Sequence, residues 1–158
     1  MQAIIGLRYD IHLATNSGRL ATKILIVEDD APSAQAIGEV LELEGFDVRR
    51  AANATDAIAI TSAFAPHVVL VDLQLPEVAD GRSFVEGYRR SARPAASVIV
   101  MSGRIDGSAI AKSAGADAYI AKPIDFDALL RAISLTLSAA QGFSSRIAFG
   151  SWRPGPTT

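Results

Sequence analysis

Five short apolar runs recur along the middle of the chain, with longer stretches of mixed character between them. They are KILIVE (23–28), FDVRRA (46–51), HVVLVD (67–72), SVIVMS (97–102) and AYIAK (118–122). The first, third and fourth runs are almost continuously apolar and rich in β-branched residues, which is typical of strands buried on both faces. FDVRRA instead alternates and carries Arg49 and Arg50, which indicates an exposed edge strand. The pattern therefore predicts five strands.

The stretches between these runs have the spacing of helices. In DAPSAQAIGEVLELEG, Asp30 can cap a helix that has Pro32 in its first turn. Ile37, Val40 and Leu41 then form one apolar stripe. Further helices are predicted at 54–64, 82–92, 108–114 and 125–140, the last with an apolar face of Phe126, Leu129, Leu130, Ile133 and Leu137. Alternating strands and helices predict a doubly wound α/β fold, an open parallel sheet with helices on both faces.

The composition is that of one globular domain. The chain has 158 residues, of which 49% are hydrophobic, so it can bury a sizeable core. Its net charge of −2, without a long basic run, argues against direct binding to nucleic acid. The absence of cysteine excludes disulfides, thiol nucleophiles and cysteine-based zinc sites, and only two histidines are present, far apart in the sequence.

The strand and helix pattern occupies residues 22–140, which we take as the domain. Residues 1–21 form an N-terminal extension in which the sequence permits a strand or disorder, and residues 141–158 have the composition of a flexible tail. Charged residues interrupt the apolar N-terminus before a signal peptide can form, and no run approaches the roughly 20 apolar residues of a membrane-spanning helix. We therefore expect a soluble, cytoplasmic protein without a membrane partner.

Four of the predicted strands end in residues with metal or phosphate chemistry. These endings are Glu28-Asp29-Asp30 on the first strand, Asp72 on the third, Ser102-Gly103 on the fourth and Lys122-Pro123 on the fifth. In open parallel sheets, ligands bind at the carboxyl ends of the strands. One such ending is commonly only a cap or a turn, but four at one edge of a sheet indicate a functional site.

The acidic residues of the first and third strand ends lie close together if these strands are neighbours. Two unit charges about 4 Å apart repel by on the order of 4 kcal/mol at an effective dielectric of about 20, so a proton or a cation must be bound. Oxygen ligands favour a hard ion such as Mg²⁺. Lys122 can pair with Asp72 or with a phosphoryl oxygen, to which the Ser102 hydroxyl can also donate. The residues therefore predict a magnesium site for phosphoryl transfer to Asp72.

Four motifs together give the sequence a family resemblance that covers roughly residues 22–140. They are ILIVEDD at the first predicted strand, VVLVDLQLP at the third, VIVMSG at the fourth and GADAYIAKP at the fifth. With these motifs the chain resembles the receiver domain of two-component response regulators. The resemblance implies a flavodoxin-like or CheY-like fold with five parallel strands in the order 2-1-3-4-5.

The resemblance also implies roles for the residues at the strand ends. Asp72 corresponds to the phosphoacceptor, and Lys122 to the essential lysine. Asp29 corresponds to the direct Mg²⁺ ligand and Glu28 to an acidic residue that acts largely through water. The backbone carbonyl of Gln74 corresponds to a further metal ligand.

Two further positions match the family's switch. Ser102 stands at the position of the switch hydroxyl and Tyr119 at that of the switch aromatic, and the resemblance makes the bond between Lys122 and Pro123 a candidate for the cis form. The sequence departs from the family in two places. The switch hydroxyl is Ser rather than the commoner Thr, and the loop LQLPEVADG after the third strand is one residue longer than the common pattern. Metal geometry or partner contacts can therefore differ on that side.

The function that the resemblance implies is that of a single-domain response regulator, since we expect no output domain after residue 140. A histidine kinase or phosphotransfer protein would donate the phosphoryl group, because the chain has no phosphoacceptor histidine motif. Phosphorylation of Asp72 would draw Ser102 toward the phosphoryl group and let Tyr119 move into the vacated space. The surface of the fourth helix, fifth strand and fifth helix would then change its affinity for a downstream protein target. No enzyme activity is expected beyond self-phosphorylation and autodephosphorylation.

Three other interpretations stay open. An aspartate-nucleophile phosphatase of the haloacid dehalogenase type also uses an Asp at a strand end, but it needs a second Asp where this chain has Gln74. A flavodoxin-like binder of flavin or nucleotide needs a Gly-rich or hydroxyl-rich loop after the first strand, and here that loop is acidic. An interaction module that works without phosphorylation can share the fold, but the presence of all the site residues argues against it.

Overall fold

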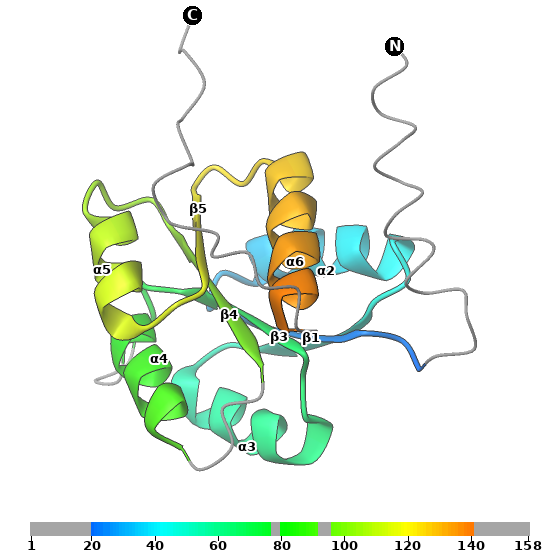
Figure 1. Cartoon of the computed structure of the whole chain (residues 1–158), viewed down its shortest axis with the longest axis horizontal. Coiled ribbons are helices and arrows are strands. Elements are labelled where there is room, and N and C mark those ends of the chain that lie inside the picture. The colour runs from blue at the N-terminus through cyan, green and yellow to red at the C-terminus, as the bar shows by residue number, and fades with distance from the viewer. Residues whose placement is uncertain (1–19, 77–79, 92–95, 141–158) are drawn as a thin grey trace, which may run out of the picture.

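Five strands form one parallel sheet in the computed structural model, which describes residues 20–76, 80–91 and 96–140 (Figure 1). They are β1 (Lys23–Val27), β2 (Asp47–Ala51), β3 (Val68–Asp72), β4 (Ser97–Ser102) and β5 (Ala118–Ala121). Their order in the sheet is β2-β1-β3-β4-β5, and each adjacent pair is parallel. The predicted fold class and strand order are therefore confirmed, and the ends of each strand lie within one residue of their predicted positions.

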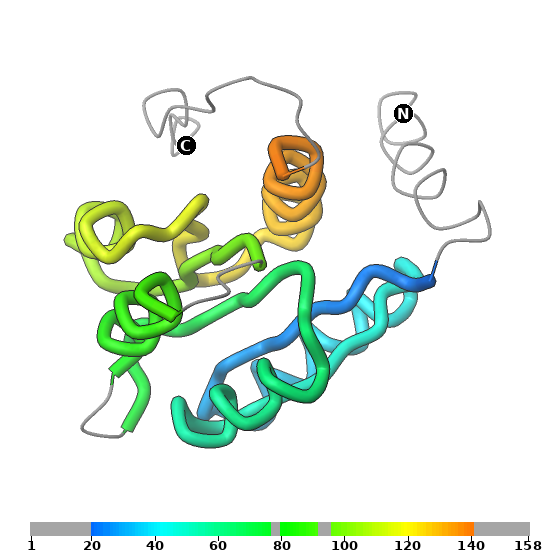
Figure 2. The backbone as a smooth tube through the Cα atoms, turned by 60° about the horizontal axis from the view of Figure 1, so that its bottom comes forward, coloured from blue at the N-terminus to red at the C-terminus, as the bar shows by residue number. Residues whose placement is uncertain are grey.

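Helices cover both faces of this sheet. They are α2 (Ala31–Leu43), α3 (Ala54–Phe64), α4 (Gly81–Arg90), α5 (Gly107–Ala114) and α6 (Phe126–Ala140). Residues of α2 and α6 pack on one face, and residues of α3, α4 and α5 pack on the other. Figure 2 shows α6 and α3 on opposite sides of the strands. The sheet is thus the middle layer of three.

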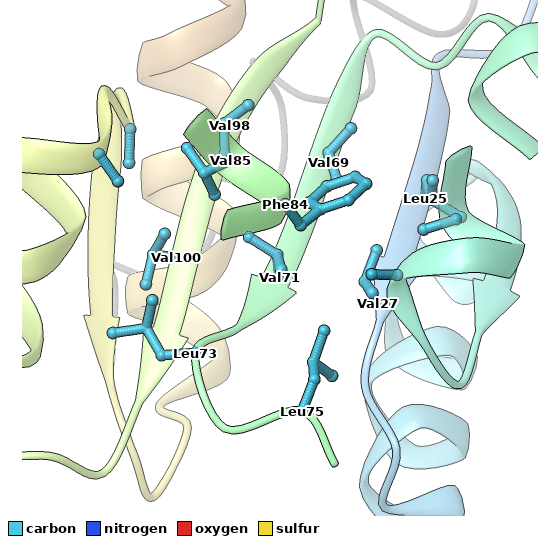
Figure 3. Packing of buried hydrophobic residues seen from close by; sticks show 14 of the residues in the cluster. Leu25, Val27, Val69, Val71, Leu73, Leu75, Phe84, Val85, Val98 and Val100 are labelled. Carbon is cyan, nitrogen blue, oxygen red and sulfur yellow. The ribbon is translucent and has the colours of Figure 1, made fainter. Parts of the chain in front are cut away.

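Side chains that alternate along each strand divide the core into two clusters. In β1, Leu25 and Val27 face α3, α4 and α5, whereas Ile24 and Ile26 face α2 and α6. Figure 3 shows the first of these clusters, with Phe84 of α4 among the valines of the sheet. Because helices cover both faces, the central strands need apolar residues at every position, which explains their unbroken apolar runs.

The arginine-bearing strand lies at an edge, as predicted. Arg49 and Arg50 of β2 are both exposed. The Arg50 side chain turns back over α2, where its Nε donates to the carbonyl of Ala34 at 3.3 Å and its Nη2 contacts Glu42 at 2.9 Å. These charges make the open edge a poor template for pairing with another strand.

The predicted helices lie within two residues of their observed ends. Asp30 caps α2, because its carboxylate accepts a hydrogen bond from the N–H of Ser33 at 3.0 Å. One residue of the apolar face predicted for the last helix is wrong, because Phe126 is exposed rather than buried. Burial on the sheet begins one turn later, at Leu129, and continues at Ile133.

The expected N-terminal extension and C-terminal tail fall outside the described residues, apart from residues 20 and 21. Within the described ranges, none of the helices is long and apolar enough to cross a membrane.

Candidate functional site

The carboxyl ends of the strands meet at one edge of the sheet. β1 pairs with β3 so that Val27 lies beside Val71, and Asp72 of β3 lies beside Met101 of β4. The residues at or just after these positions are therefore neighbours in space. This register brings together the predicted site residues from four separate strand ends.

Glu28, Asp29 and Asp72 form an acidic cluster at this edge. One carboxylate oxygen from each residue lies within 4.8 Å of the other two. Glu28 is 2% exposed and Asp72 is 3% exposed, whereas Asp29 faces solvent. Burial takes away the water that would otherwise solvate the two inner carboxylates, so the cluster requires nearby positive charge. The proximity predicted for these three residues is confirmed.

Lys122 supplies one positive charge from the end of β5, where its bond to Pro123 is cis, as predicted. Its Nζ lies 2.7 Å from Asp72 Oδ2 and 2.7 Å from Glu28 Oε2. Burial alone would lower the pKa of Lys122, but hydrogen bonds to the two carboxylates outweigh burial and raise it. Burial also raises the pKa of Glu28, against the opposing effect of Lys122. The sequence indicated the contact with Asp72 but not that Glu28 shares the ammonium.

Backbone N–H groups fix the orientation of the two buried carboxylates. The N–H of Gln74 donates to Asp72 Oδ1 at 2.9 Å, and the N–H of Asp30 donates to Glu28 Oε1 at 3.1 Å. Each carboxylate therefore turns one oxygen toward the backbone and the other toward Lys122. The role of the Gln74 carbonyl as a metal ligand stays a prediction.

Ser102 and Tyr119 contact each other beside this cluster. Ser102 is fully buried, and its Oγ accepts a hydrogen bond from the N–H of Arg104 at 3.1 Å. The Tyr119 hydroxyl donates to the Ser102 carbonyl at 3.0 Å. Burial raises the pKa of Tyr119, and the charge of Asp106 adds to the rise. The two residues assigned to the switch are thus adjacent, while the switching itself stays a prediction.

Gly81, the last residue of the loop LQLPEVADG, lies against the backbone of Asp72, a contact that the sequence did not indicate. A Cβ at this position would sit 2.0 Å from the Asp72 carbonyl oxygen and 2.7 Å from Leu73 Cα. The start of α4 can therefore approach β3 this closely only with glycine. The available signal was a glycine, a poor helix former, directly after the helix cap Asp80.

The donor set of the acidic cluster fits a magnesium ion. Its three carboxylates offer oxygen atoms only, which are the ligands that hard divalent cations prefer. One ammonium does not balance three ionised carboxylates, so negative charge is left for a cation to neutralise. The exposure of Asp29 places the outer side of the cluster in contact with water, from which a hydrated ion can enter.

Comparison with protein families decides what this arrangement represents. The model of the response regulator receiver domain matches residues 24–134, a range that includes every site residue described above. The chain belongs to the response regulator receiver domain family. Receiver domains are typically phospho-accepting switches rather than true enzymes, and they work with histidine kinases. The acidic cluster is consistent with the magnesium site of receiver domains.

Individual relatives show the same domain alone and within longer proteins. The receiver domain is 30% identical over 118 residues to the DNA-binding dual master transcriptional regulator RpaA of Synechocystis, which covers 73% of this chain and 48% of RpaA. A CheY-like response regulator receiver domain protein from Methanospirillum hungatei superimposes with a TM-score of 0.71 at 31% identity, covering 77% of this chain and 98% of that one. NtrX from Brucella abortus superimposes with a TM-score of 0.71 at 26% identity, covering 77% of this chain and 28% of the NtrX chain. The chain spans 28% to 60% of the length of the first curated relatives.

Proposed function

We propose that this receiver domain accepts a phosphoryl group on Asp72, with the support of Mg²⁺, from a phosphohistidine of a kinase or phosphotransfer protein. One observation carries the proposal. The buried Asp72 carboxylate contacts the Lys122 ammonium at 2.7 Å and also belongs to an oxygen cluster that fits a divalent cation. A carboxylate nucleophile flanked by two sources of positive charge has what phosphoryl transfer requires.

The transfer exchanges one bond to phosphorus for another. A carboxylate oxygen of Asp72 attacks the phosphorus atom, and an O–P bond forms as the N–P bond of the donor phosphohistidine breaks. The electron pair of the broken bond stays on the imidazole nitrogen, which takes up a proton from solvent. Lys122 pairs with a phosphoryl oxygen and offsets the charge that develops there. The N–H of Gln74 holds Asp72 Oδ1 and so keeps the carboxylate from rotating.

Asp29, Asp72 and the Gln74 carbonyl would hold the magnesium ion, with Glu28 acting largely through water. When bound, the ion supplies positive charge that neutralises the phosphoryl oxygens during transfer. Glu28 also has a task of its own, because its contact with Lys122 holds the ammonium beside Asp72. The chain's residues thus divide the work between binding the cation and placing the lysine.

The output is a change in a protein-binding surface. Phosphorylation replaces the single negative charge of Asp72 with about −1.5 to −2. Ser102 moves toward the phosphoryl group, and Tyr119 follows it into the space that Ser102 leaves. Because Tyr119 lies on β5 beside α5, the surface of α5, β5 and α6 changes for a downstream protein partner. We place this domain in the cytoplasm and assign it protein partners rather than nucleic acid, since its sequence has a net charge of −2 and no long basic run.

Acetyl phosphate tests the acceptor chemistry without a kinase. Incubation of the protein with acetyl phosphate and Mg²⁺ is expected to add the mass of one phosphoryl group, and EDTA is expected to prevent the gain. Asp72→Ala removes the acceptor and is expected to show no gain, and Lys122→Met is expected to slow it about a hundredfold, the scale of a lost charge-stabilising group. Intact-protein mass spectrometry measures each rate.

Asp30→Asn is the matched control, because it changes a neighbouring exposed carboxylate and keeps a side chain that can cap α2. This variant is expected to gain the phosphoryl mass at the wild-type rate. A wild type that gains no mass, or an Asp72→Ala variant that gains it as fast as the wild type, would contradict the proposal.

A further inference from the structure

The loop between β4 and α5 carries an ion pair that begins two residues after Ser102. Arg104 and Asp106 form a two-pronged contact, with Nε to Oδ1 at 2.8 Å and Nη2 to Oδ2 at 2.8 Å. The side chain of Arg104 is 46% exposed and that of Asp106 is 50% exposed. Exposed pairs of this kind are weak, because water and salt screen them. A stronger anion within reach of Arg104 can therefore replace Asp106.

Asp106 occupies the cap position of α5 but does not cap it. Its carboxylate forms no hydrogen bond with the first N–H groups of the helix, since Arg104 holds both of its oxygens. The other four helices of the described residues each have a capping side chain: Asp30 for α2, Asn53 for α3, Asp80 for α4 and Asp125 for α6. The sequence thus provides α5 with a capping residue, but the carboxylate of that residue is bound to Arg104 instead.

The position of Arg104 connects this pair to the proposed acceptor. Its N–H donates to Ser102 Oγ at 3.1 Å, and Ser102 ends β4, the strand beside Asp72. Ser102 directly follows Met101, the residue of β4 that lies beside Asp72, so the backbone of Arg104 is held one strand away from the proposed acceptor. A phosphoryl group on Asp72 would carry about −1.5 to −2 charge and offer oxygens at the spacing that a guanidinium binds with two hydrogen bonds.

We propose that Arg104 exchanges its pair with Asp106 for the phosphoryl group on Asp72, and that the released Asp106 carboxylate then caps α5. The inference rests on the proposed phosphorylation and adds a route by which it reaches the α5 surface. The turn in which the Arg104 carbonyl accepts from the N–H of Gly107 at 3.1 Å opens during the exchange. Ile105, at the tip of this turn, is fully exposed, so its movement breaks no packing.

The helix that receives the cap is the one most dependent on it. α5 has eight residues, GSAIAKSA, and begins with Gly107, a poor helix former. Isolated helices of this length are not stable in water, so terminal contacts decide how well the first turn is held. A cap on α5 therefore orders the first turn of a helix on the proposed output surface, and the uncapped state leaves it free to fray.

Hydrogen exchange at the start of α5 tests the proposal. A cap at Asp106 would bond the N–H of Ser108 or Ala109, the second and third residues of the helix. In the wild type, phosphorylation with acetyl phosphate and Mg²⁺ is expected to slow exchange at one of these amides about fivefold, as measured by NMR. Mass spectrometry of the same sample reports the extent of phosphorylation.

Three variants test whether slower hydrogen exchange in α5 comes from the release of Asp106 by Arg104 or from some other ordering of the loop. Arg104→Gln frees the carboxylate, and Asp106→Asn keeps a good capping residue that no longer pairs with arginine. Both variants are expected to show the slowed exchange without phosphate. Asp106→Ala has no capping group and is expected to show fast exchange with and without phosphate. Both residues are exposed, so each of the three variants is expected to fold.

The outcomes distinguish this inference from the function on which it rests. If phosphorylation leaves hydrogen exchange at the amides of Ser108 and Ala109 unchanged, the proposed change of partner by Arg104 is wrong, whereas the proposed phosphorylation of Asp72 still holds. Fast exchange in unphosphorylated Arg104→Gln and Asp106→Asn would lead to the same conclusion. A wild type that gains no phosphoryl mass would overturn the proposed function, and this inference with it.

Discussion

Lys122 contacts two buried carboxylates at once, so the electrostatics of the site depend on this residue. Removing one partner of a buried ion pair costs about 3–5 kcal/mol, because a charge is left without its counter-charge. The Lys122 side chain is 26% exposed, so the cost here lies below that range. Without the ammonium, Glu28 and Asp72 would face each other, and the pair would hold a proton instead. Lys122 thus keeps the carboxylates together before any phosphoryl group arrives.

The raised pKa of Glu28 leads to a prediction for metal-free protein. Because burial raises this pKa above the ordinary value of 4.5, the folded state holds the proton to higher pH than the unfolded chain does. The contribution of Glu28 to stability is therefore full below about pH 4.5 and is lost as the pH rises through the folded pKa. Urea unfolding in EDTA measures this effect. As the pH rises from about 4.5 through the folded pKa of Glu28, the free energy of unfolding of the wild type is expected to fall relative to that of Glu28→Gln.

Asp30 provides a control, because its pKa is shifted in the opposite direction to that of Glu28. Its pKa lies below the ordinary value of 3.8, because it accepts hydrogen bonds from Ser33. Its contribution is present above pH 3.8 and is lost as the pH falls through the lower folded pKa, so the difference from Asp30→Asn should appear only in strong acid. A wild type that gains stability relative to Glu28→Gln as the pH rises from 4.5 would contradict the assignment.

Gly81 gives a second prediction at this scale. In Gly81→Ala the new methyl group would lie 2.0 Å from the carbonyl oxygen of Asp72, and the atom it meets is backbone, which cannot turn aside. We expect a loss of about 1–3 kcal/mol in the free energy of unfolding, as for other overpacked sites, and slower phosphorylation because the acceptor's backbone is displaced. Urea midpoints and the acetyl phosphate assay measure the two effects.

Gly87 in the same helix is the matched control. A Cβ at this position meets no atom within 4 Å, so Gly87→Ala is expected to stabilise the protein by about 0.5–1 kcal/mol through helix propensity alone. Equal effects from the two substitutions would show that contact with Asp72 does not matter.

At the scale of elements, one arginine ties α4 to the strands beyond it. Arg89 donates from Nε to the carbonyl of Gly115 at 2.9 Å and from Nη1 to that of Ala96 at 3.3 Å, and it also contacts Asp117. The Asp117 carboxylate in turn accepts from the N–H of Val98 at 2.7 Å. This network joins the end of α4 to the starts of β4 and β5, the two strands that carry Ser102 and Lys122.

Arg89→Ala is therefore expected to destabilise the protein by about 1.5–3 kcal/mol, the cost of hydrogen bonds to a charged group. Arg90→Ala changes the adjacent, exposed arginine and is expected to shift the free energy of unfolding by less than about 0.5 kcal/mol. Thermal or urea unfolding of the two variants side by side measures the difference. Similar losses in both would mean that the network adds no stability.

The strands, their order and the acidic cluster could be predicted because each depends on local pattern or on a motif. Apolar runs located the strands to within one residue, and parallel order then placed Glu28 beside Asp72. The contacts of Arg89 and Gly81 could not be predicted, because they join residues that no periodicity relates. The exposure of Phe126 was missed for a similar reason. Helical spacing gives a face but does not say where along the helix the sheet begins.

At the scale of the whole molecule, two apolar clusters and one polar edge make up the unit that folds. The two clusters comprise residues between Ile24 and Leu137, and the site residues lie between Glu28 and Lys122. The family match covers residues 24–134, nearly the same range. Figure 1 shows α6 across the sheet from α3, so the last helix covers strands that would otherwise be open on that face. Folding and the site therefore depend on the same stretch of chain.

A fragment of residues 20–140 is accordingly expected to fold as the full chain does, with a urea midpoint within experimental error of it and the same phosphoryl mass gain. A fragment of residues 20–125 removes α6 and with it Leu129 and Ile133, which are 0% and 1% exposed. Deleting large buried side chains costs about 2–5 kcal/mol each, and a domain of this size has only about 5–15 kcal/mol in total. The shorter fragment is therefore expected to lack cooperative unfolding and phosphorylation, as circular dichroism and mass spectrometry would report. A clear loss of stability in the 20–140 fragment would place part of the folding unit in the removed segments instead.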